Sequence, residues 1–123
     1  MSWDLKSDSP IYLQLIEQVK LRILSGVYPP GGKLPAVRDL AAEAAVNPNT
    51  MQKALAELER DGLVYSQRTA GRFITEDQGM IQNLKQDIAK EEAALFFRRM
   101  QAIGFSREEA LSLLKNTGEG DAQ

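Results

Sequence analysis

The chain has no cysteine and no histidine among its 123 residues. Without cysteine it forms no disulfide bonds and has no thiolate chemistry. Without histidine it lacks the commonest general base and metal ligand. The sequence also has no glycine-rich phosphate cradle and no cluster of carboxylates arranged for acid–base work. We therefore expect no enzymatic activity, no metal site and no cofactor.

Long apolar runs are missing as well. No segment approaches the roughly 20 apolar residues that span a bilayer. The N-terminus does not show the charged and then apolar pattern of a secretion signal. These absences predict a cytoplasmic, soluble protein with no membrane partner.

Positive charge is too sparse for a protein that binds nucleic acid regardless of sequence. Residues 1–76 contain nine Lys/Arg and nine Asp/Glu, whereas residues 77–123 contain six and eight, which gives a net charge of −2. Such a balance is compatible with a specific DNA binder that relies on a few placed cations. It predicts modest non-specific affinity.

The most strongly patterned stretch, residues 46–62, predicts a helix with a polar start and an acidic end. Asn47 is a favoured N-cap, and Pro48 suits the first helical position. Apolar residues recur at helical spacing along one side, namely Met51, Ala54, Leu55 and Leu58. The first two turns are otherwise polar, with Asn49, Thr50, Gln52 and Lys53. Such groups at the positive end of the helix dipole suit contact with nucleic acid.

A first helix is predicted upstream, capped by Asp8 or Ser9 and ended by Gly26. Its expected buried face consists of Tyr12, Leu15, Ile16, Val19 and Ile23. After a turn rich in proline and glycine, residues 33–34 fit a short strand.

A second helix is expected to begin at Pro35 and to stop near Ala45, with Arg38 projecting from its first turn. Only Val46 and Asn47 then separate it from the patterned helix. Two short helices across such a tight turn are typical of a helix-turn-helix. In a unit that binds a duplex, the second helix would enter the major groove.

Two β-rich segments, residues 63–66 and 72–75, predict a hairpin that follows the helix-turn-helix. With the short strand at 33–34 to pair against, this arrangement is a winged helix. Positive charge is expected at the wing tip from Arg68 and Arg72, with Gly71 between them. There they would reach phosphates or the minor groove, although charges on a hairpin can also simply guard its edge against aggregation.

From residue 77 onward the pattern becomes that of a long helix reaching Ile103, followed by a shorter one. Gly104 suits the C′ position, and residues 106–109 form a capping box that opens the last helix. The long helix carries apolar residues along two adjacent lines, among them Ile81, Leu84, Ile88, Leu95, Phe96 and Met100. These exceed what one short partner helix covers, so we expect them to form the interface of a symmetric homodimer.

The predicted fold is therefore mainly α with a small β-hairpin. We expect a winged helix-turn-helix DNA-binding domain over residues 1–76, a two-helix dimerisation region over 77–116 and a flexible tail over 117–123.

Three motifs resemble the winged-helix domain of GntR-type bacterial transcription regulators. They are LPAVRDLA at 34–41, VNPNTMQKAL at 46–55 and LERDGLV at 58–64, and the resemblance covers roughly residues 9–76. The NPNT motif and the short two-helix tail are similar to the YtrA subfamily, in which the C-terminal region mediates dimerisation.

This resemblance implies DNA contacts at Arg38, at the helix start formed by Asn47, Asn49, Thr50 and Gln52, and at the wing glycine Gly71. One departure stands out, because relatives usually carry a G-x-G turn in the wing, where this chain has Thr69-Ala70-Gly71. For Lys53, DNA contact and a purely solubilising role both remain open.

Taken together, these features predict a sequence-specific DNA-binding transcription regulator, a repressor, that binds a palindromic operator as a homodimer. The helix over 47–61 would lie in the major groove and the wing over 67–72 at the backbone or minor groove. The alternative is a winged-helix adaptor that binds another protein. The sequence names no small-molecule effector, and any effector would bind at the dimer interface or between the tail and the winged helix.

Overall fold

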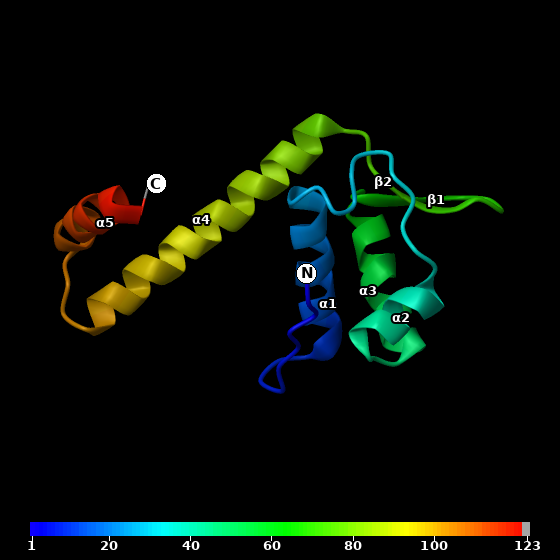
Figure 1. Cartoon of the computed structure of the whole chain (residues 1–123), viewed down its shortest axis with the longest axis horizontal. Helices are drawn as coiled ribbons and strands as arrows, with labels where there is room; N and C mark the ends of the chain where they lie inside the picture. Colours follow the sequence, from blue (N-terminus) through cyan, green and yellow to red (C-terminus); the bar gives the residue numbers. More distant parts are fainter. Residues whose placement is uncertain (122–123) are drawn as a thin grey trace. The chain divides into compact units, whose positions relative to one another are not determined.

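The computed structural model describes residues 1–121 and divides the chain into two units, 1–83 and 84–121. We call them unit 1 and unit 2. The described residues form five helices and one antiparallel hairpin (Figure 1). In chain order these are α1 (Ile11–Leu24), α2 (Val37–Ala44), α3 (Pro48–Arg60), β1 (Val64–Gln67), β2 (Gly71–Ile74), α4 (Gln78–Ala102) and α5 (Arg107–Asp121). The predicted fold class, mainly α with a small hairpin, is confirmed.

Helix α1 begins at Ile11, and its N-cap residue is Pro10. The prediction that Asp8 or Ser9 would cap it is therefore wrong. Gly26 follows the helix with a φ of 85°, a left-handed conformation that glycine adopts without strain. The buried residues of α1 include most of the predicted face and one unexpected charge, and they are Leu15, Ile16, Val19, Arg22 and Ile23.

Helix α3 lies at the centre of unit 1, because α1, α2 and β1 all pack against it. Its four predicted apolar residues, Met51, Ala54, Leu55 and Leu58, are completely buried. Other completely or almost completely buried side chains of unit 1 come from α1, α2 and the hairpin, among them Leu15, Val19, Leu40, Val64 and Ile74. This core holds the helix-turn-helix rigidly on the rest of the unit.

The hairpin places Val64 opposite Ile74 and Gln67 opposite Gly71. The rings of Tyr65 and Phe73 stack across it with centroids 5.8 Å apart. Beside β2, the predicted strand at 33–34 is reduced to a single bridge between Lys33 and Phe73. Backbone hydrogen bonds at Gly31, Gly32 and Leu34 nevertheless hold this segment along β2. The winged arrangement is thus present, although the sheet within residues 1–121 has two strands rather than three.

In unit 2, the end of α4 is followed by Gly104 with a φ of 98°, as the sequence predicts. Glu109 and Ser106 form the predicted capping box, since the Ser106 N–H donates to the Glu109 carboxylate and the Glu109 N–H donates to Ser106 Oγ. Helix α5 then continues to Asp121. The predicted tail over 117–123 is therefore helical as far as Asp121, and residues 122–123 lie outside the described part.

Candidate nucleic-acid interface

The start of α3 is built as its sequence predicts. Asn47 is the N-cap, and its Oδ1 accepts a hydrogen bond from the Asn49 N–H with 2.7 Å between the atoms. Pro48 occupies the first helical position. Because Asn47 supplies this capping bond, the side chains of the following turn are not needed to cap the helix.

The polar face of α3 points away from the core. Asn49, Gln52 and Lys53 are exposed and Thr50 is half-buried, whereas Met51 on the opposite face is completely buried. The structure therefore presents hydrogen-bonding side chains on the first two turns of a helix whose other face is fixed by packing. That is the arrangement in which a helix reads base edges in a major groove.

Lys53 has a specific neighbour, since its Nζ lies 3.7 Å from the centroid of the Tyr12 ring of α1. A cation over an aromatic face is attracted by the ring quadrupole. Tyr12 is half-buried, and the sequence assigned it only to the core face of α1. The contact restrains the lysine side chain before any ligand binds. The side chain therefore loses less conformational entropy on binding.

The turn between α2 and α3 is tight because Ala45 adopts a left-handed conformation, with φ 59° and ψ 47°. The Val46 N–H donates to the Ala41 carbonyl and closes the end of α2. Arg38 is exposed in the first turn of α2. Alanine in this conformation is strained by roughly 1–2 kcal/mol, which the fully buried core around α3 offsets.

The wing tip consists of Arg68, Thr69 and Ala70, between the last paired residues Gln67 and Gly71. Thr69 has a φ of 64°, although a β-branched residue rarely adopts that conformation. It occupies the place of the first glycine in the family's turn, and its positive φ is one that glycine adopts without strain. Arg68 is exposed at this tip.

Gly71 is favoured by its backbone, which has a φ of 111°. A Cβ atom at this position would lie 3.0 Å from Cε of Lys33. Lys33 is exposed and belongs to an open hollow of about 730 Å³ between the wing and the start of α2. Lys33 was not among the predicted cations, although the strand expected at residues 33–34 beside the hairpin was a signal for its position.

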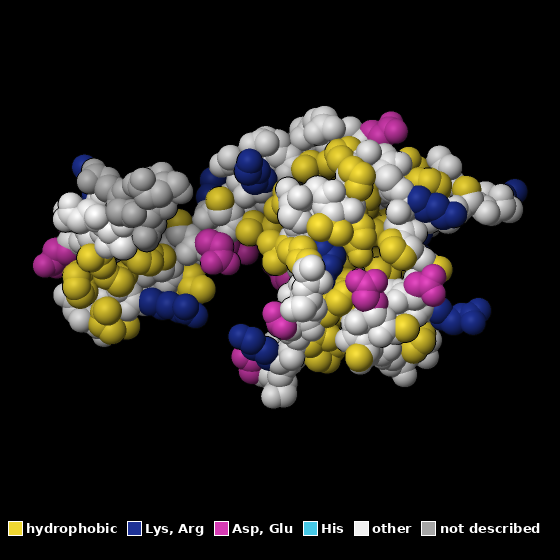
Figure 2. Space-filling view, in the orientation of Figure 1, with side chains coloured by type: hydrophobic (Ala, Val, Ile, Leu, Met, Phe, Trp, Pro, Cys, Tyr) yellow, Lys and Arg dark blue, Asp and Glu magenta, His cyan; other side chains and the backbone are white. Residues whose placement is uncertain are grey.

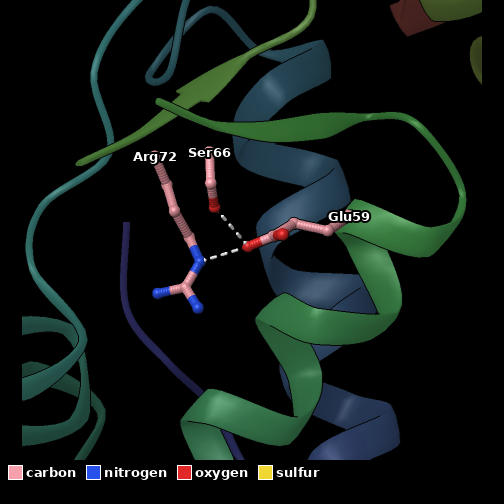
Figure 3. A network of polar contacts seen from close by, with 3 residues as sticks. All are labelled: Glu59, Ser66 and Arg72. Atoms are coloured by element: carbon pink, nitrogen blue, oxygen red, sulfur yellow. Dashed lines mark hydrogen bonds and ion pairs between the residues drawn. The ribbon is translucent and has the colours of Figure 1, made fainter. Parts of the chain in front are cut away.

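Arg72 lies further from the tip than the sequence suggests, opposite Ser66 in the hairpin. Its Nε donates to Oε1 of Glu59 in α3 with 2.5 Å between the atoms, and Ser66 Oγ donates to the same oxygen at 2.9 Å (Figure 3). The Arg72 hydrogen bond is the main reason that the pKa of Glu59 lies below its usual value; partial burial opposes this shift, and Ser66 reinforces it. Instead of carrying free charge at the wing tip, Arg72 ties strand β2, one residue pair below the tip, to the end of α3.

The residues predicted for the dimer interface differ in how deeply they are buried. Ile81, Leu84, Ile88, Leu95 and Phe96 are half-buried, whereas Met100 is buried. Among residues 84–117, Met100 and Ala110 are the two buried side chains. Met100 therefore belongs to the packing of unit 2 itself.

Large apolar side chains remain exposed around α5, as the hydrophobic patch there in Figure 2 shows. They are Ile103, Phe105, Leu111, Leu113 and Leu114. None of these five residues was among those predicted for the dimer interface. Three leucines within four residues of α5, with α4 as the other helix of the predicted tail, were the sequence signal that this surface would remain exposed.

Two absences concern the rest of the described chain. Within residues 1–121 no three His, Cys, Asp or Glu side chains gather in a way that would hold a metal ion. No described helix is both long and apolar enough to cross a membrane.

Comparison with known proteins decides the family. The model of "Bacterial regulatory proteins, gntR family" matches residues 11–74. The chain belongs to this family. Across 115 residues, or 94% of this chain and 95% of the relative, it is 38% identical to the HTH-type transcriptional regulator YhcF of Bacillus subtilis. It is also 47% identical over 74 residues to the HTH-type transcriptional repressor YtrA of Bacillus subtilis, which covers 60% of this chain and 57% of that one.

Solved structures of gntR-family members agree with this assignment. A GntR family transcriptional regulator from Listeria monocytogenes is 37% identical and superposes with a TM-score of 0.84, covering 91% of this chain and 98% of that one. The AraR DNA-binding domain in complex with operator ORX1 is 30% identical, with a TM-score of 0.53 over 58% of this chain and 88% of that one. The predicted resemblance and the predicted class, a winged-helix transcription regulator, are thereby confirmed.

Proposed function

We propose that the chain is a repressor that binds a palindromic operator as a homodimer, with α3 of each subunit in successive major grooves. The observation that carries this proposal is the start of α3, where exposed Asn49 and Gln52 stand on a helix whose opposite face is completely buried. The AraR DNA-binding domain, similar in fold, is known in complex with its operator, and YtrA is a repressor by name.

Within this proposal, Asn49, Thr50 and Gln52 contact base edges, and Asn47 holds the helix start beside the DNA backbone. Lys53, restrained by Tyr12, contacts a phosphate. Phosphate contacts position a protein on the duplex, while base contacts specify the sequence.

The backbone of one strand lies along the hollow between α2 and the wing, which is bordered by Lys33 and Gly71. Arg38 projects from the first turn of α2 on the same unit. Arg68 at the wing tip reaches the backbone or the minor groove. Arg72 acts indirectly, because its bond to Glu59 sets the angle between the wing and α3.

The dimer forms through unit 2. The exposed apolar side chains of α5 and the turn before it supply an interface, and the half-buried predicted line on α4 extends it. An isologous pair buries the same patch on both subunits and is the commonest arrangement of homodimers. Two copies of α3 would then meet half-sites about one helical turn, or about 10 bp, apart.

The protein acts without catalysing a reaction. Its exposed functional groups suit recognition, and the chain has neither histidine nor cysteine to serve as a general base or nucleophile. If an effector exists, it modulates DNA binding and is not converted.

Selection of bound sequences from a random duplex pool, with the stoichiometry of the complex measured alongside, tests this function. We expect a palindromic consensus and two chains per site. Affinity should also fall steeply as salt rises, because phosphate contacts release counterions. A pool without enrichment, and affinity that does not change with salt, would instead indicate a protein-binding adaptor.

Asn49→Ala tests the proposed base contacts of α3 directly. Loss of a base-reading side chain should weaken operator binding by about 1–3 kcal/mol and relax specificity at one base pair. Asn83→Ala is the matched control, since Asn83 is also an exposed helical asparagine, in α4, and should change nothing. Unchanged operator affinity in Asn49→Ala would remove Asn49 from the proposed contacts.

A further inference from the structure

Residues 1–10 precede the segment that matches the gntR-family model, and we call them the N-terminal arm. The arm folds back along α1, as its dark blue trace in Figure 1 shows. Gln14 of α1 holds one end of it. The Lys6 N–H donates to Gln14 Oε1 at 2.7 Å, and Gln14 Nε2 donates to the carbonyls of Lys6 and Ser9 at 2.7 and 2.9 Å.

Arg22 of α1 holds the other end. This side chain is 1% exposed, and within residues 1–121 it forms no ion pair with a carboxylate. Its Nη2 donates to the carbonyls of Met1 and Ser2 at 3.1 and 3.2 Å, while Nη1 donates to Gln18. A buried cation is costly unless hydrogen-bonded, so the arm supplies part of what allows Arg22 to be buried.

Trp3 connects these contacts to α2. Its ring lies 3.7 Å from Cζ of Arg22, and its Nε1–H donates to Oε1 of Glu43 in α2 at 3.1 Å. Helices α1 and α2 both pack on α3 but make few contacts with each other. Trp3 therefore bridges two helices that are otherwise joined mainly through α3.

Tyr28, in the loop between α1 and α2, is buried. Its pKa is raised by burial and by the negative charge of Glu43, and the positive charge of Arg22 opposes the shift. The Tyr28 N–H also donates to the Arg22 carbonyl at 3.1 Å, so this loop is anchored at the residue that the arm covers.

We propose that the N-terminal arm is a strap that ties α2 to α1, with Trp3 as its positioning residue. By restraining α2, the strap holds Arg38 and the turn before α3 in their DNA-binding arrangement. This last consequence rests on the proposed function, whereas the restraint itself is independent of DNA.

Amide hydrogen exchange in the full-length protein tests the restraint, because exchange reports local opening. Trp3→Phe keeps an aromatic ring over Arg22 but removes the N–H that binds Glu43, and Glu43→Ala removes the acceptor. Each change should speed exchange at residues 41–46 about two- to fivefold, as expected for the loss of one hydrogen bond. Combining them should add little, because both remove the same interaction.

Two variants serve as controls. Glu43→Gln keeps an acceptor for the indole and should restore wild-type exchange. Asp4→Asn alters an exposed arm residue that is neither in the bridge nor at an anchor and should leave exchange unchanged. Trp3 is the sole tryptophan of the chain, so its quenching by acrylamide should rise in Glu43→Ala and not in Glu43→Gln.

Operator affinity provides the second readout, and it should fall by about the same factor in Trp3→Phe and Glu43→Ala. Unchanged exchange in α2 in both variants would overturn the strap, whatever the protein does with DNA. Faster exchange in α2 with unchanged operator affinity would overturn the link from the strap to DNA binding. A wild-type chain that binds no duplex would contradict the proposed function, and the exchange experiment would still decide on the strap.

Discussion

Unit 1 and unit 2 bury their apolar side chains to very different extents. In unit 1, Leu15, Leu40, Leu55 and Ile74 are completely buried, and three helices and the hairpin share one core. In unit 2, two side chains among residues 84–117 are buried, while Ile103 remains 70% exposed. The first unit is closed around its own core, and the second has an open apolar face.

The difference follows from how many neighbours each helix has. Helix α3 is covered by α1, α2 and β1, so its apolar stripe meets apolar side chains from several directions. Helix α5 carries exposed Leu111, Leu113 and Leu114, and contiguous apolar patches of this kind mark interaction sites in soluble proteins. Unit 1 therefore closes its own apolar core, whereas the exposed leucines of unit 2 are the surface through which we propose that it associates.

The largest effect is expected from opening the core of unit 1. Leu55→Ala should lower the free energy of unfolding by about 2–5 kcal/mol, because it leaves a cavity at a fully buried position. Chemical denaturation followed by Trp3 fluorescence measures it. Leu13→Ala, at a residue of α1 that is 45% exposed, is the control and should cost less than about 0.5 kcal/mol. A loss below about 1 kcal/mol in Leu55→Ala would show that this core is not closed.

Next in size is the effect of charging the open face of unit 2. Leu111→Asp should weaken the homodimer at least about 100-fold, because each interface would then bury two unpaired carboxylates. Sedimentation across a concentration series measures the dimer dissociation constant. Leu13→Asp is closely matched, since Leu13 and Leu111 are both 45% exposed, and it should leave the dimer intact. An unchanged dimer in Leu111→Asp would place the interface elsewhere.

A smaller effect is expected from relieving strain in the wing. Thr69→Gly should raise the free energy of unfolding of unit 1 by about 0.5–1 kcal/mol, because glycine adopts a φ of 64° without the penalty that threonine has. Thermal unfolding measures the gain. Ala70→Gly, at a neighbour that does not have a positive φ, should instead destabilise slightly. If both changes destabilise, the Thr69 conformation is not strained.

The smallest effect concerns acid stability and separates the two units. The pKa of Glu59 is lowered mainly by its hydrogen bond from Arg72, so its contribution is complete above the unfolded value of about 4.3 and is lost as the pH falls through the lowered value. In Glu59→Gln, the free energy of unfolding of unit 1 should depend less steeply on pH in the acid range. Acid unfolding followed by Trp3 fluorescence measures this dependence.

In unit 2, Glu109 has its pKa lowered mainly by the Ser106 backbone N–H, which makes Glu109→Gln the matched comparison. It should leave the Trp3-monitored transition as it is in the wild type. A steep acid transition that persists in Glu59→Gln would show that other groups govern the acid stability of unit 1.

Local signals predicted much of the fold. Asn47 with Pro48 marked the start of α3, Gly104 marked the end of α4, and Ser106 with Glu109 marked the start of α5. Such signals act over four residues or fewer, so they can be read directly from the chain. The Asp8 or Ser9 cap failed because Pro10, with a backbone outside the helical region, stands at the N-cap of α1 itself.

The candidate site was predicted where it depends on one helix and missed where it depends on several elements. The polar start of α3 was expected in full, whereas the pairing of Arg72 with Glu59 joins residues 13 apart. Tyr12 beneath Lys53 and Lys33 beside Gly71 are likewise contacts between separate segments. Helical or strand periodicity along the chain carries no information about such pairs.

By itself, the sequence determined which segments are helical, which face of each helix is apolar, and which family the chain belongs to. It did so because capping, turn formation and side-chain periodicity are short-range properties. Only the tertiary structure decided that Arg22 is buried beneath the N-terminal arm, that Arg72 is tied to α3, and that the apolar face of α5 stays open. Those outcomes depend on which distant side chains meet, and packing alone brings them together.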